Sequence, residues 1–353
     1  MSDTTLPSME GPVCPLPLKH NDQIILGHGS GGRLTHDLIK NIFLPYLSSP
    51  PLLSGDDFAR LSKSNGEVIV STDCHIVSPL FFPGGDIGRL AVCGTVNDIA
   101  VSGAQPLYLT AGFILEEGLP VQTLIRILDS MRTAAQEAGI QIVAGDTKVV
   151  EKGKADGVFI TTTGIGFLPE GRHINGHQAQ PGDVILVSGS MGDHGIAVLA
   201  ERGELGFSAQ VVSDVAPLNG LIQELLAAAP NTHVLRDPTR GGLATTLNEI
   251  AAQSQVGMLL YENAIPIQPA VQAACEMLGF DPLYIANEGK IVAIVPAAEA
   301  EAALLAMRRH PYGKLASRIG EVTNDSGRVL LKTSIGATRV LDMLAGEILP
   351  RIC

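Results

Sequence analysis

The stretch "GEVIVSTDCHIVSPLFFPGGDIGRLAVCGTVNDIAVSGA", residues 66–104, contains the pattern that decides the fold. Its apolar run ends at Asp73 and is typical of a buried strand. The run "DIGRLAVCGTVNDIAVSGA" predicts a helix whose small residues permit close packing. Another strand is expected over residues 106–118, so strands and helices already alternate within this stretch.

The same alternation continues on both sides. The pattern predicts an amphipathic helix from Val121 to Ala138, closed by Gly139, and then strands over 140–146 and 157–168. Upstream, "LGHGSGGRLTHDLIKNIFLPYL" (26–47) predicts a Gly-rich turn and a short helix that stops near Pro45. Residues 1–22 are rich in proline and aperiodic, and we assign them to a leader.

A polar, turn-rich stretch at 173–183 divides the chain near residue 175. Beyond it, predicted strands at 184–189, 256–262, 290–295, 318–323 and 328–333 alternate with helices, which indicates an α/β domain. The expected organisation is a leader (1–22), an N-terminal domain (23–175), a C-terminal α/β domain (176–335) and a tail (336–353). A length of 353 residues also favours two domains.

Composition excludes several classes of protein. A formal charge of −12 without a basic run argues against nucleic acid binding. No apolar run reaches the roughly 20 residues of a membrane span, and residues 1–20 do not resemble a targeting signal. The five cysteines are widely separated and include no Cys-x-x-Cys pair, which favours a reducing compartment. We expect a cytoplasmic protein.

Acidic residues stand at predicted strand ends or in Gly-rich turns: Asp57, Asp73, Asp98, Asp146 and Asp237. Any one of them could form a turn or cap a helix. Together they are better explained by Mg²⁺, which takes carboxylate oxygens and bridges them to nucleotide phosphates. The set therefore indicates a metal–nucleotide site.

A phosphate also needs backbone N–H groups that it can approach closely. "GHGSGG" (27–32), ahead of a helix, is a candidate cradle, and a plain flexible loop is the alternative. "SGSMGDHG" (188–195) lacks the dinucleotide-binding spacing, so we interpret it as a structural turn. His28, His75 and His194 form no pair with ligand spacing, and no transition-metal site is assigned.

Three further residues could carry chemistry. Lys148 follows Asp146 by two positions, so on a strand both side chains share one face. They could form a salt bridge, or Lys148 could stabilise charge on a transferred phosphoryl group. Glu288, in "ANEGK", could line a cleft as a base. Cys353 ends the chain, either by chance or as a substrate carrier on a mobile tail.

The motifs "HGSGG", "STDCHIVSPLFFPGGDIG", "NDIAVSGA", "GDTKVV", "VSGSMGDHG", "RDPTRGG", "ANEGK" and the terminal "LPRIC" resemble the HypE family of hydrogenase maturation proteins, the carbamoyl dehydratases. The match runs from about residue 24 to Cys353. More broadly the chain is similar to aminoimidazole ribonucleotide synthetase, selenophosphate synthetase and thiamine-monophosphate kinase. Cys14 lies outside the match, and a selenophosphate synthetase is less favoured because its nearby Cys and Lys pattern is missing.

The resemblance implies a two-domain α/β (α+β) PurM-like fold, with N-terminal strands paired across a homodimer and ATP between the domains. It implies Mg²⁺ ligands at Asp57, Asp73, Asp98 and Asp237. The implied nucleotide-binding residues are His28, Gly29, Ser30, Gly31, Gly32, Asp73, Asp98, Gly145 and Thr147. Cys353, Lys148, Glu288 and Asp146 are the implied catalytic residues.

The family's reaction explains the terminal cysteine. It implies that a HypF carbamoyltransferase places a carboxamide on Cys353, and that ATP then drives its dehydration to a thiocyanate. Glu288 would act as base and Lys148 as electrostatic stabiliser, and the HypC–HypD complex would receive the cyano group for [NiFe] hydrogenase. Two alternatives stay open, a small-molecule ATP enzyme and a non-catalytic scaffold. We expect the tail to dock weakly, with Arg351, Ile352 and Cys353 extended like a strand.

Overall fold

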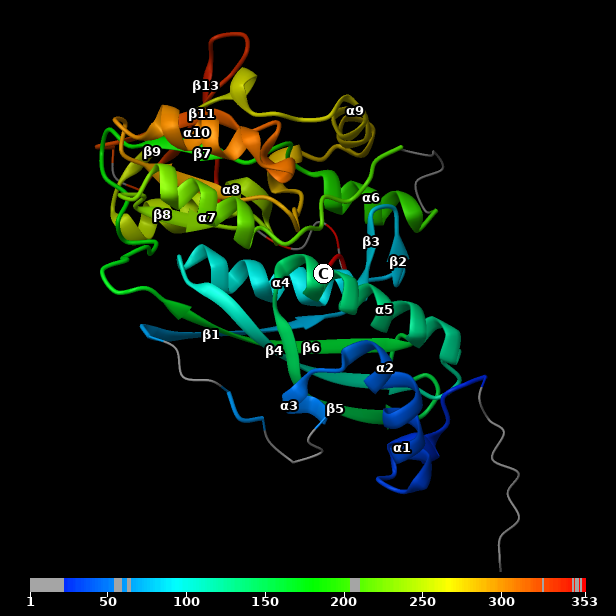
Figure 1. The fold of residues 1–353 in the computed structure, drawn as a ribbon. Helices are drawn as coiled ribbons and strands as arrows, with labels where there is room; N and C mark the ends of the chain where they lie inside the picture. Colours follow the sequence, from blue (N-terminus) through cyan, green and yellow to red (C-terminus); the bar gives the residue numbers. More distant parts are fainter. Residues whose placement is uncertain are drawn as a thin grey trace, which may run out of the picture.

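The computed structural model describes residues 22–53, 59–61, 65–203, 210–325, 327–344, 346, 349 and 351–353. Two α/β layers of structure lie one above the other, and the C-terminus lies between them (Figure 1). The predicted mixed α/β architecture is therefore confirmed.

The N-terminal domain is built on one sheet with the strand order β1-β6-β4-β5. Its strands are β1 (Glu67–His75), β4 (Gln105–Glu116), β5 (Gln141–Val150) and β6 (Val158–Leu168). Two helices, α4 (Ile87–Val101) and α5 (Val121–Ala138), cover the face that points toward the C-terminal domain (Figure 1). A two-stranded hairpin, β2 (Phe81–Phe82) with β3 (Gly85–Asp86), precedes α4.

Local sequence explains these elements. In β1 the odd residues from Ile69 turn inward and the even ones outward, as the two-residue period of a strand requires. Helix α4 begins at an N-cap, Asp86, whose side chain accepts from the backbone N–H groups of Gly88 and Arg89. Helix α5 has the predicted bounds and ends at Gly139, which adopts φ 69°.

The N-terminal segment folds against β5 as η1 (Leu26–Gly29), α1 (Arg33–Leu38), the π-helical turn η2 (Ile39–Phe43), α2 (Leu44–Leu47) and α3 (Pro50–Leu53). The predicted stop near Pro45 is wrong. Pro45 lies in the first turn of α2, where its missing N–H group costs no hydrogen bond. The helical run therefore continues past it to Leu47.

The C-terminal domain has the sheet order β13-β12-β9-β11-β7-β10-β8. The strands are β7 (Val184–Val187), β8 (Val234–Arg236), β9 (Gly257–Tyr261), β10 (Val292–Val295), β11 (Ser317–Thr323), β12 (Val329–Lys332) and β13 (Thr338–Val340). The helices are α6 (Asp193–Glu201), α7 (Asn219–Ala228), α8 (Gly242–Ser254), α9 (Pro269–Leu278) and α10 (Ala300–Arg309), with 3-10 turns η3 (Glu262–Ala264), η4 (Pro282–Tyr284) and η5 (Pro311–Gly313).

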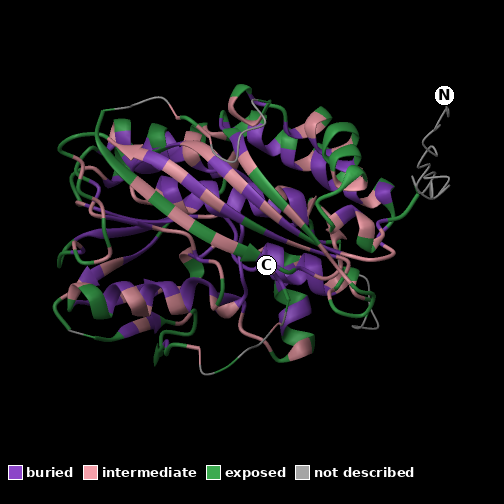
Figure 2. Ribbon diagram, turned by 90° about the horizontal axis from the view of Figure 1, so that it is seen from below, coloured by how far each residue is buried: buried purple, intermediate pink, exposed green. Residues whose placement is uncertain are grey.

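Strands β8 and β13 were not predicted. β13 pairs with β12, so the sheet extends into the segment that we assigned to the tail from residue 336. The outer face of the N-terminal sheet, seen from below, is striped with exposed and half-buried residues (Figure 2). In the part of the chain that the structure describes, no helix is long and apolar enough to cross a membrane.

Candidate active site

The site lies where the two domains meet, and the loop "NEG" (287–289) ties its walls together. The Asn287 side chain accepts from the Gly192 N–H group at 2.7 Å and donates to the Pro238 carbonyl at 2.9 Å. Asn97 of α4 donates across the domain boundary to the Glu288 carbonyl at 3.4 Å. Gly289 passes so close to Asp214 that a Cβ atom would lie 1.7 Å from its carbonyl oxygen. The loop therefore requires glycine.

Glu288 is only 5% exposed, and its carboxyl lies beside the thiol of Cys353. Burial, followed by repulsion from Asp237, Asp214 and Asp73, raises the pKa of Glu288 well above its usual value. Burial and the Glu288 carboxyl also raise the pKa of the Cys353 thiol. One oxygen of Glu288, Oε1, is buried without a hydrogen-bond partner. The carboxyl thus keeps one unused acceptor oxygen.

Two of the predicted aspartates, Asp73 and Asp237, lie near Glu288, and Asp98 lies near both of them. Asp73, on β1, lies against Gly94 of α4, and Asp98 accepts from Ser71 Oγ at 2.7 Å. Burial and repulsion from Asp98 and Asp73 raise the pKa of Asp237 to about 7. Burial raises the pKa of Asp98, and Asp73 raises it further. These carboxyls repel one another, which is the condition that a bound cation relieves.

Among the described residues no group of three or more His, Cys, Asp or Glu side chains is close enough to hold a metal ion by itself. Asp57 lies outside the described residues. Mg²⁺ commonly uses only one or two carboxylates together with phosphates and water, and the oxygen donors present fit that pattern.

The tail is docked in this cleft. Ile352 is 4% exposed and packs with the N-terminal core, and its carbonyl accepts from His194 Nε2 at 2.9 Å. Arg351 adopts φ 53°, so the chain bends there, and the strand-like arm that we predicted is wrong. The bend directs the Ile352 side chain into the core, while the Cys353 thiol meets Glu288.

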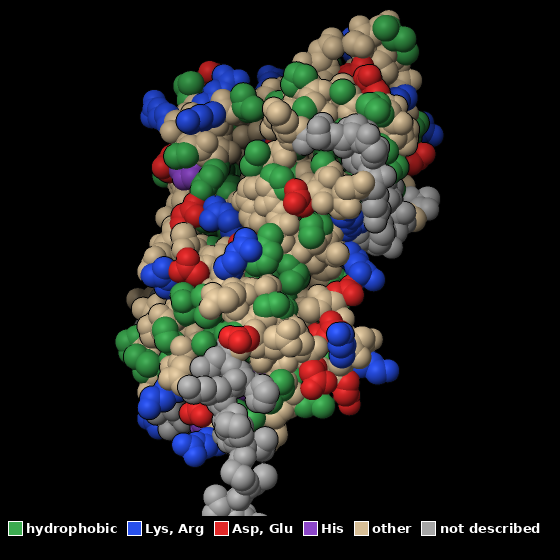
Figure 3. Space-filling model, turned by 90° about the vertical axis from the view of Figure 1, so that its right-hand side faces the viewer, with side chains coloured by type: hydrophobic (Ala, Val, Ile, Leu, Met, Phe, Trp, Pro, Cys, Tyr) green, Lys and Arg blue, Asp and Glu red, His purple; other side chains and the backbone are tan. Residues whose placement is uncertain are grey.

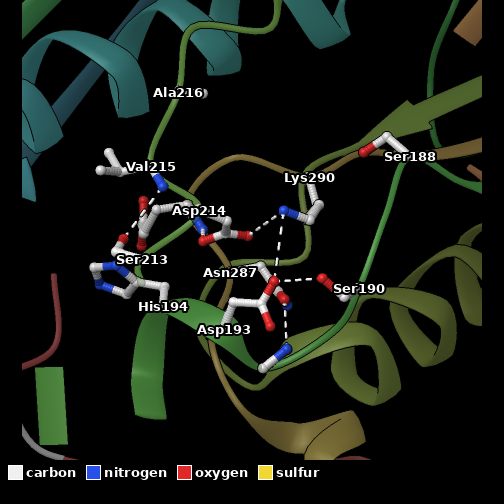
Figure 4. Close-up of polar contacts among 12 residues, drawn as sticks. Ser188, Ser190, Asp193, His194, Ser213, Asp214, Val215, Ala216, Asn287 and Lys290 are labelled. Atoms are coloured by element: carbon white, nitrogen blue, oxygen red, sulfur yellow. Dashed lines mark hydrogen bonds and ion pairs between the residues drawn. The ribbon is translucent and has the colours of Figure 1, made fainter. Parts of the chain in front are cut away.

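A buried network of charged side chains supports the backbone of the loop 287–289 (Figure 4). The Lys290 ammonium lies 3.1 Å from Asp214 Oδ2 and 3.9 Å from Asp193 Oδ2. Asp214 Oδ1 also accepts from the Glu288 N–H group at 3.1 Å. Burial raises the pKa of Asp193 to about 6 although Ser190 donates to it. The network fixes the backbone from which Glu288 projects.

The predicted residues Asp146 and Lys148 form a second group, which lies away from this cleft. Lys148 Nζ is 2.7 Å from Asp146 Oδ2, and both side chains are largely exposed. They project from β5, at the opposite edge of the sheet from β1. Register places Asp73 and Gly145 in one row, three strand spacings or about 14 Å apart. Asp146 and Lys148 occupy the outer face of the sheet, whereas Asp73 faces α4. One chain does not bring the two groups together.

The Gly-rich loop belongs to this second group. A Cβ atom on Gly29 would lie 2.8 Å from the backbone nitrogen of Val149, next to Lys148. His28 is buried, whereas Ser30, Gly31 and Gly32 are exposed. A hollow of about 110 Å³ beside the loop is lined by apolar side chains, with Gly145, Asp146 and Thr147 in its wall. The hollow also reaches α1, the helix that follows the loop, through Thr35.

Several residues of the cleft were not predicted from the sequence. Arg202 and Ser78 hold the tail, Lys290 and Asp214 support Glu288, and His194 had no assigned role. Arg240 is near enough to Cys353 to lower the pKa of its thiol against the larger effects of burial and Glu288. None of these residues stands in a spacing that indicates its partner. Their roles depend on contacts between segments far apart in the chain.

Two family models match the chain. The N-terminal domain of AIR synthase related proteins matches residues 55–168, and the C-terminal domain of the same family matches residues 180–332. The fold and the interdomain cleft are therefore those of an AIR synthase related protein.

Similar proteins define the family more closely. The chain is 57% identical over 341 residues to carbamoyl dehydratase HypE of Cupriavidus necator, covering 96% of this chain and 97% of that protein. The chain belongs to the HypE family of carbamoyl dehydratases. A crystal structure of HypE in complex with ATP superposes with a TM-score of 0.90 at 51% identity, covering 93% of this chain and 99% of that one. HypE in a solved HypE–HypF complex superposes with a TM-score of 0.77 at 51% identity, covering 87% of this chain and 99% of that one.

Proposed function

We propose that this chain uses ATP to dehydrate an S-carboxamide on its own Cys353 to a thiocyanate, which supplies a cyanide ligand for the iron of [NiFe] hydrogenase. The observation that carries the proposal is the docked position of the terminal thiol next to the buried Glu288 carboxyl. A terminal cysteine present by chance would have no reason to dock against a buried acid.

The chemistry follows from the poor leaving group in an amide. The carboxamide oxygen attacks the γ-phosphorus of ATP and ADP departs, which leaves an O-phosphorylated imidate after loss of one N–H proton. Glu288 then takes the remaining N–H proton while the C–O bond breaks, so inorganic phosphate departs and the C≡N bond forms. Burial and the neighbouring carboxylates raise the pKa of Glu288, which makes its ionised form a stronger base. Dehydration is thereby divided into two easier steps.

We further propose that Asp57, Asp73, Asp98 and Asp237 hold Mg²⁺. The mutual repulsion of Asp98, Asp237 and Asp73 supports this assignment, because a divalent cation would neutralise it. When bound, Mg²⁺ orients the phosphates and offsets charge on the transferred group. Asp73 and Asp237 would hold the ion near Glu288, where phosphate would leave the carboxamide.

The Gly-rich loop is proposed to close over the triphosphate through its backbone N–H groups. His28 anchors the loop, since its buried Nδ1 accepts from the Ile25 N–H group at 3.1 Å. Gly29, Ser30, Gly31 and Gly32 would face the phosphates, and Gly145 and Thr147 would line the nucleoside side of the hollow. The solved complex of a HypE protein with ATP supports ATP as the nucleotide.

Lys148 and Asp146 require a second chain. They are on the outer face and far edge of the sheet relative to Asp73, so we propose that a homodimer supplies them to the cleft of the partner. The same outer face exposes apolar side chains, with Val68 and Val70 each 60% exposed. Such residues on an open sheet face support its burial between two copies. Lys148 would then stabilise charge on the transferred phosphoryl group.

Two partners complete the proposed cycle in the cytoplasm. A HypF carbamoyltransferase would place the carboxamide on Cys353, which the solved HypE–HypF complex supports. A HypC–HypD complex would then receive the cyano group. Charged side chains of both signs are scattered over the face in Figure 3 without a basic stripe, which does not favour a nucleic acid partner.

Intact-protein mass spectrometry tests the function. The chain is incubated with HypF, carbamoyl phosphate and Mg-ATP, and the native sequence is compared with Cys353→Ala and Glu288→Gln. We expect gain of a carboxamide and then loss of one water, the second only with hydrolysable ATP and Glu288 present. A modification that survives Cys353→Ala would favour the small-molecule enzyme. Absence of ATP turnover would favour the scaffold.

A further inference from the structure

The docked tail contacts one face of α6 along its whole length. His194, Val198 and Arg202 recur every four residues and therefore share a side of the helix. His194 donates to the Ile352 carbonyl, Val198 packs in the same core as Ile352, and Arg202 donates to the Arg351 carbonyl at 2.7 Å. Gly195 lies on the neighbouring stripe, where a Cβ atom would approach Leu349 within 3.3 Å.

The opposite wall comes from the N-terminal domain. The Ser78 N–H group donates to the Arg351 carbonyl at 3.2 Å, and Arg202 Nε donates to the Ser78 carbonyl at 2.7 Å. The rings of Phe82 and His194 meet edge to face with centroids 5.4 Å apart. The Arg202 guanidinium thus joins the tail and both domains at one point.

His194 is fixed for this role. It is fully buried, and its Nδ1 lies 2.8 Å from Ser213 Oγ. Because a carbonyl can only accept, Nε2 carries the hydrogen, and Nδ1 accepts from the Ser213 hydroxyl in the neutral ring. Burial lowers the pKa of His194, which keeps the ring in this neutral form. The donor to the tail is therefore preorganised.

Most of these contacts are hydrogen bonds to the backbone of the tail rather than to its side chains. The Arg351 side chain forms an ion pair with Asp156, but both groups are about half exposed and such pairs contribute little. The Ile352 side chain is the exception, since it is buried in the core. The groove therefore distinguishes the tail by two carbonyls at a bend and one apolar side chain.

We propose that the α6 groove is a receptor for the C-terminal peptide, and that His194 and Arg202 are positioning residues which hold the Cys353 thiol at Glu288. This deepens the proposed function and rests on it for its purpose. The docking itself can be measured without any dehydration. Loss of either donor releases the tail, and the thiol then becomes accessible.

The test is the rate at which iodoacetamide alkylates each cysteine in the full-length chain, read by peptide mass spectrometry. The rate of Cys353 in the urea-unfolded chain, where the tail is undocked, serves as the reference. We expect Cys353 in the native chain to react at least tenfold more slowly than this reference. Arg202→Ala should raise the Cys353 rate about fivefold and His194→Ala about tenfold, as expected for losing hydrogen bonds.

Conservative variants separate positioning from folding. His194→Gln and Arg202→Lys keep a donor and should restore part of the protection, whereas Arg318→Ala removes a guanidinium from the distant β11 and should change nothing. Because Arg202 is partly exposed, Arg202→Ala is expected to fold even if His194→Ala does not. A native Cys353 rate equal to that of the unfolded reference, or unchanged protection in Arg202→Ala, overturns the proposal. Since alkylation needs no ATP, failure of the proposed function would leave these rates unaltered.

Discussion

The thiol of Cys353 lies against the carboxyl of Glu288 in the interdomain cleft, where the carboxyl disfavours the thiolate and the thiol, as a donor, favours the carboxylate. The docked thiol is therefore protonated and a poor nucleophile. In the proposed cycle the carbamoyltransferase would take the sulfur into its own site, so the tail would leave the groove to be modified and return for dehydration. The cleft would protect the sulfur between these steps.

Glu288→Gln should abolish water loss without preventing modification. Glutamine preserves the size of the side chain and the Asn97 and Asp214 contacts to the backbone of residue 288. A general base contributes about 10²- to 10⁴-fold, so the variant should accumulate the S-carboxamide and dehydrate it at least about a hundredfold more slowly. Single-turnover mass spectrometry gives the rate. Dehydration at the native rate would show that another group takes the proton.

Lys148→Met should leave stability nearly unchanged, because its exposed ion pair with Asp146 contributes less than about 1 kcal/mol. Its dehydration rate should nevertheless fall about 10²-fold or more, since Lys148 is proposed to act on the transferred phosphoryl group. Urea unfolding and the single-turnover rate provide the two readouts. Parallel loss of stability and rate would indicate a structural role instead.

Mixing tests whether Lys148 acts across the dimer. If each site combines Glu288 of one chain with Lys148 of the other, a heterodimer of Glu288→Gln and Lys148→Met contains one intact site. Random exchange of equal amounts should then restore about a quarter of the native sites. Chains are mixed, allowed to exchange and assayed by single turnover. No recovery after proven exchange would place both residues in one chain's site.

Elements that depend on a local pattern were predicted from the sequence, whereas those that depend on pairing with distant segments were not. Helix α5 was predicted with its observed bounds because its apolar face and Gly139 are adjacent in sequence. Strand β13 could not be predicted, since its three residues are exposed and depend on pairing with β12. The spacing of Asp146 and Lys148 correctly implied one face. Their separation from Asp73 follows from strand order, which no local pattern contains.

The tail illustrates the same limit. Weak docking was expected because few apolar side chains are available, and the extended form was expected because proline precedes Arg351. The observed bend is stabilised by His194 and Arg202, which lie at a helix about 150 residues earlier in the chain. Their side chains donate to the carbonyl groups of the tail. Every residue has a carbonyl group, so sequence cannot indicate which one a distant side chain will bind.

Lys290→Met should destabilise the C-terminal domain by about 3–5 kcal/mol, because it leaves two buried carboxylates unpaired. Adding Asp214→Asn should recover part of this loss by removing one of the charges. Arg318→Met, which breaks an exposed ion pair with Glu321, serves as the control and should change stability by less than about 1 kcal/mol. Urea unfolding at pH 7 measures all three variants. Equal effects of Lys290→Met and Arg318→Met would contradict a buried charge network.

Asp237 should make the metal-free protein less stable as pH rises. Burial, and then repulsion from Asp98, raises its pKa to about 7 in the folded chain, whereas the unfolded value is about 4. The folded state therefore binds the proton more tightly between these values, and its stability falls as pH increases from about 4 to 7. Asp237→Asn removes this contribution and should stabilise the protein at pH 8 but not near pH 4.

Since Asp237 is partly exposed, solvent screening reduces the full linkage value, and we expect a gain of about 1–2 kcal/mol at pH 8. Urea unfolding in EDTA compares the variant with the native chain at pH 5 and pH 8. A difference between the two proteins that stays constant with pH would mean that Asp237 does not titrate in this window. A difference that grows with pH, and disappears when Mg-ATP is added, would identify Asp237 as a carboxylate whose charge the ligand compensates.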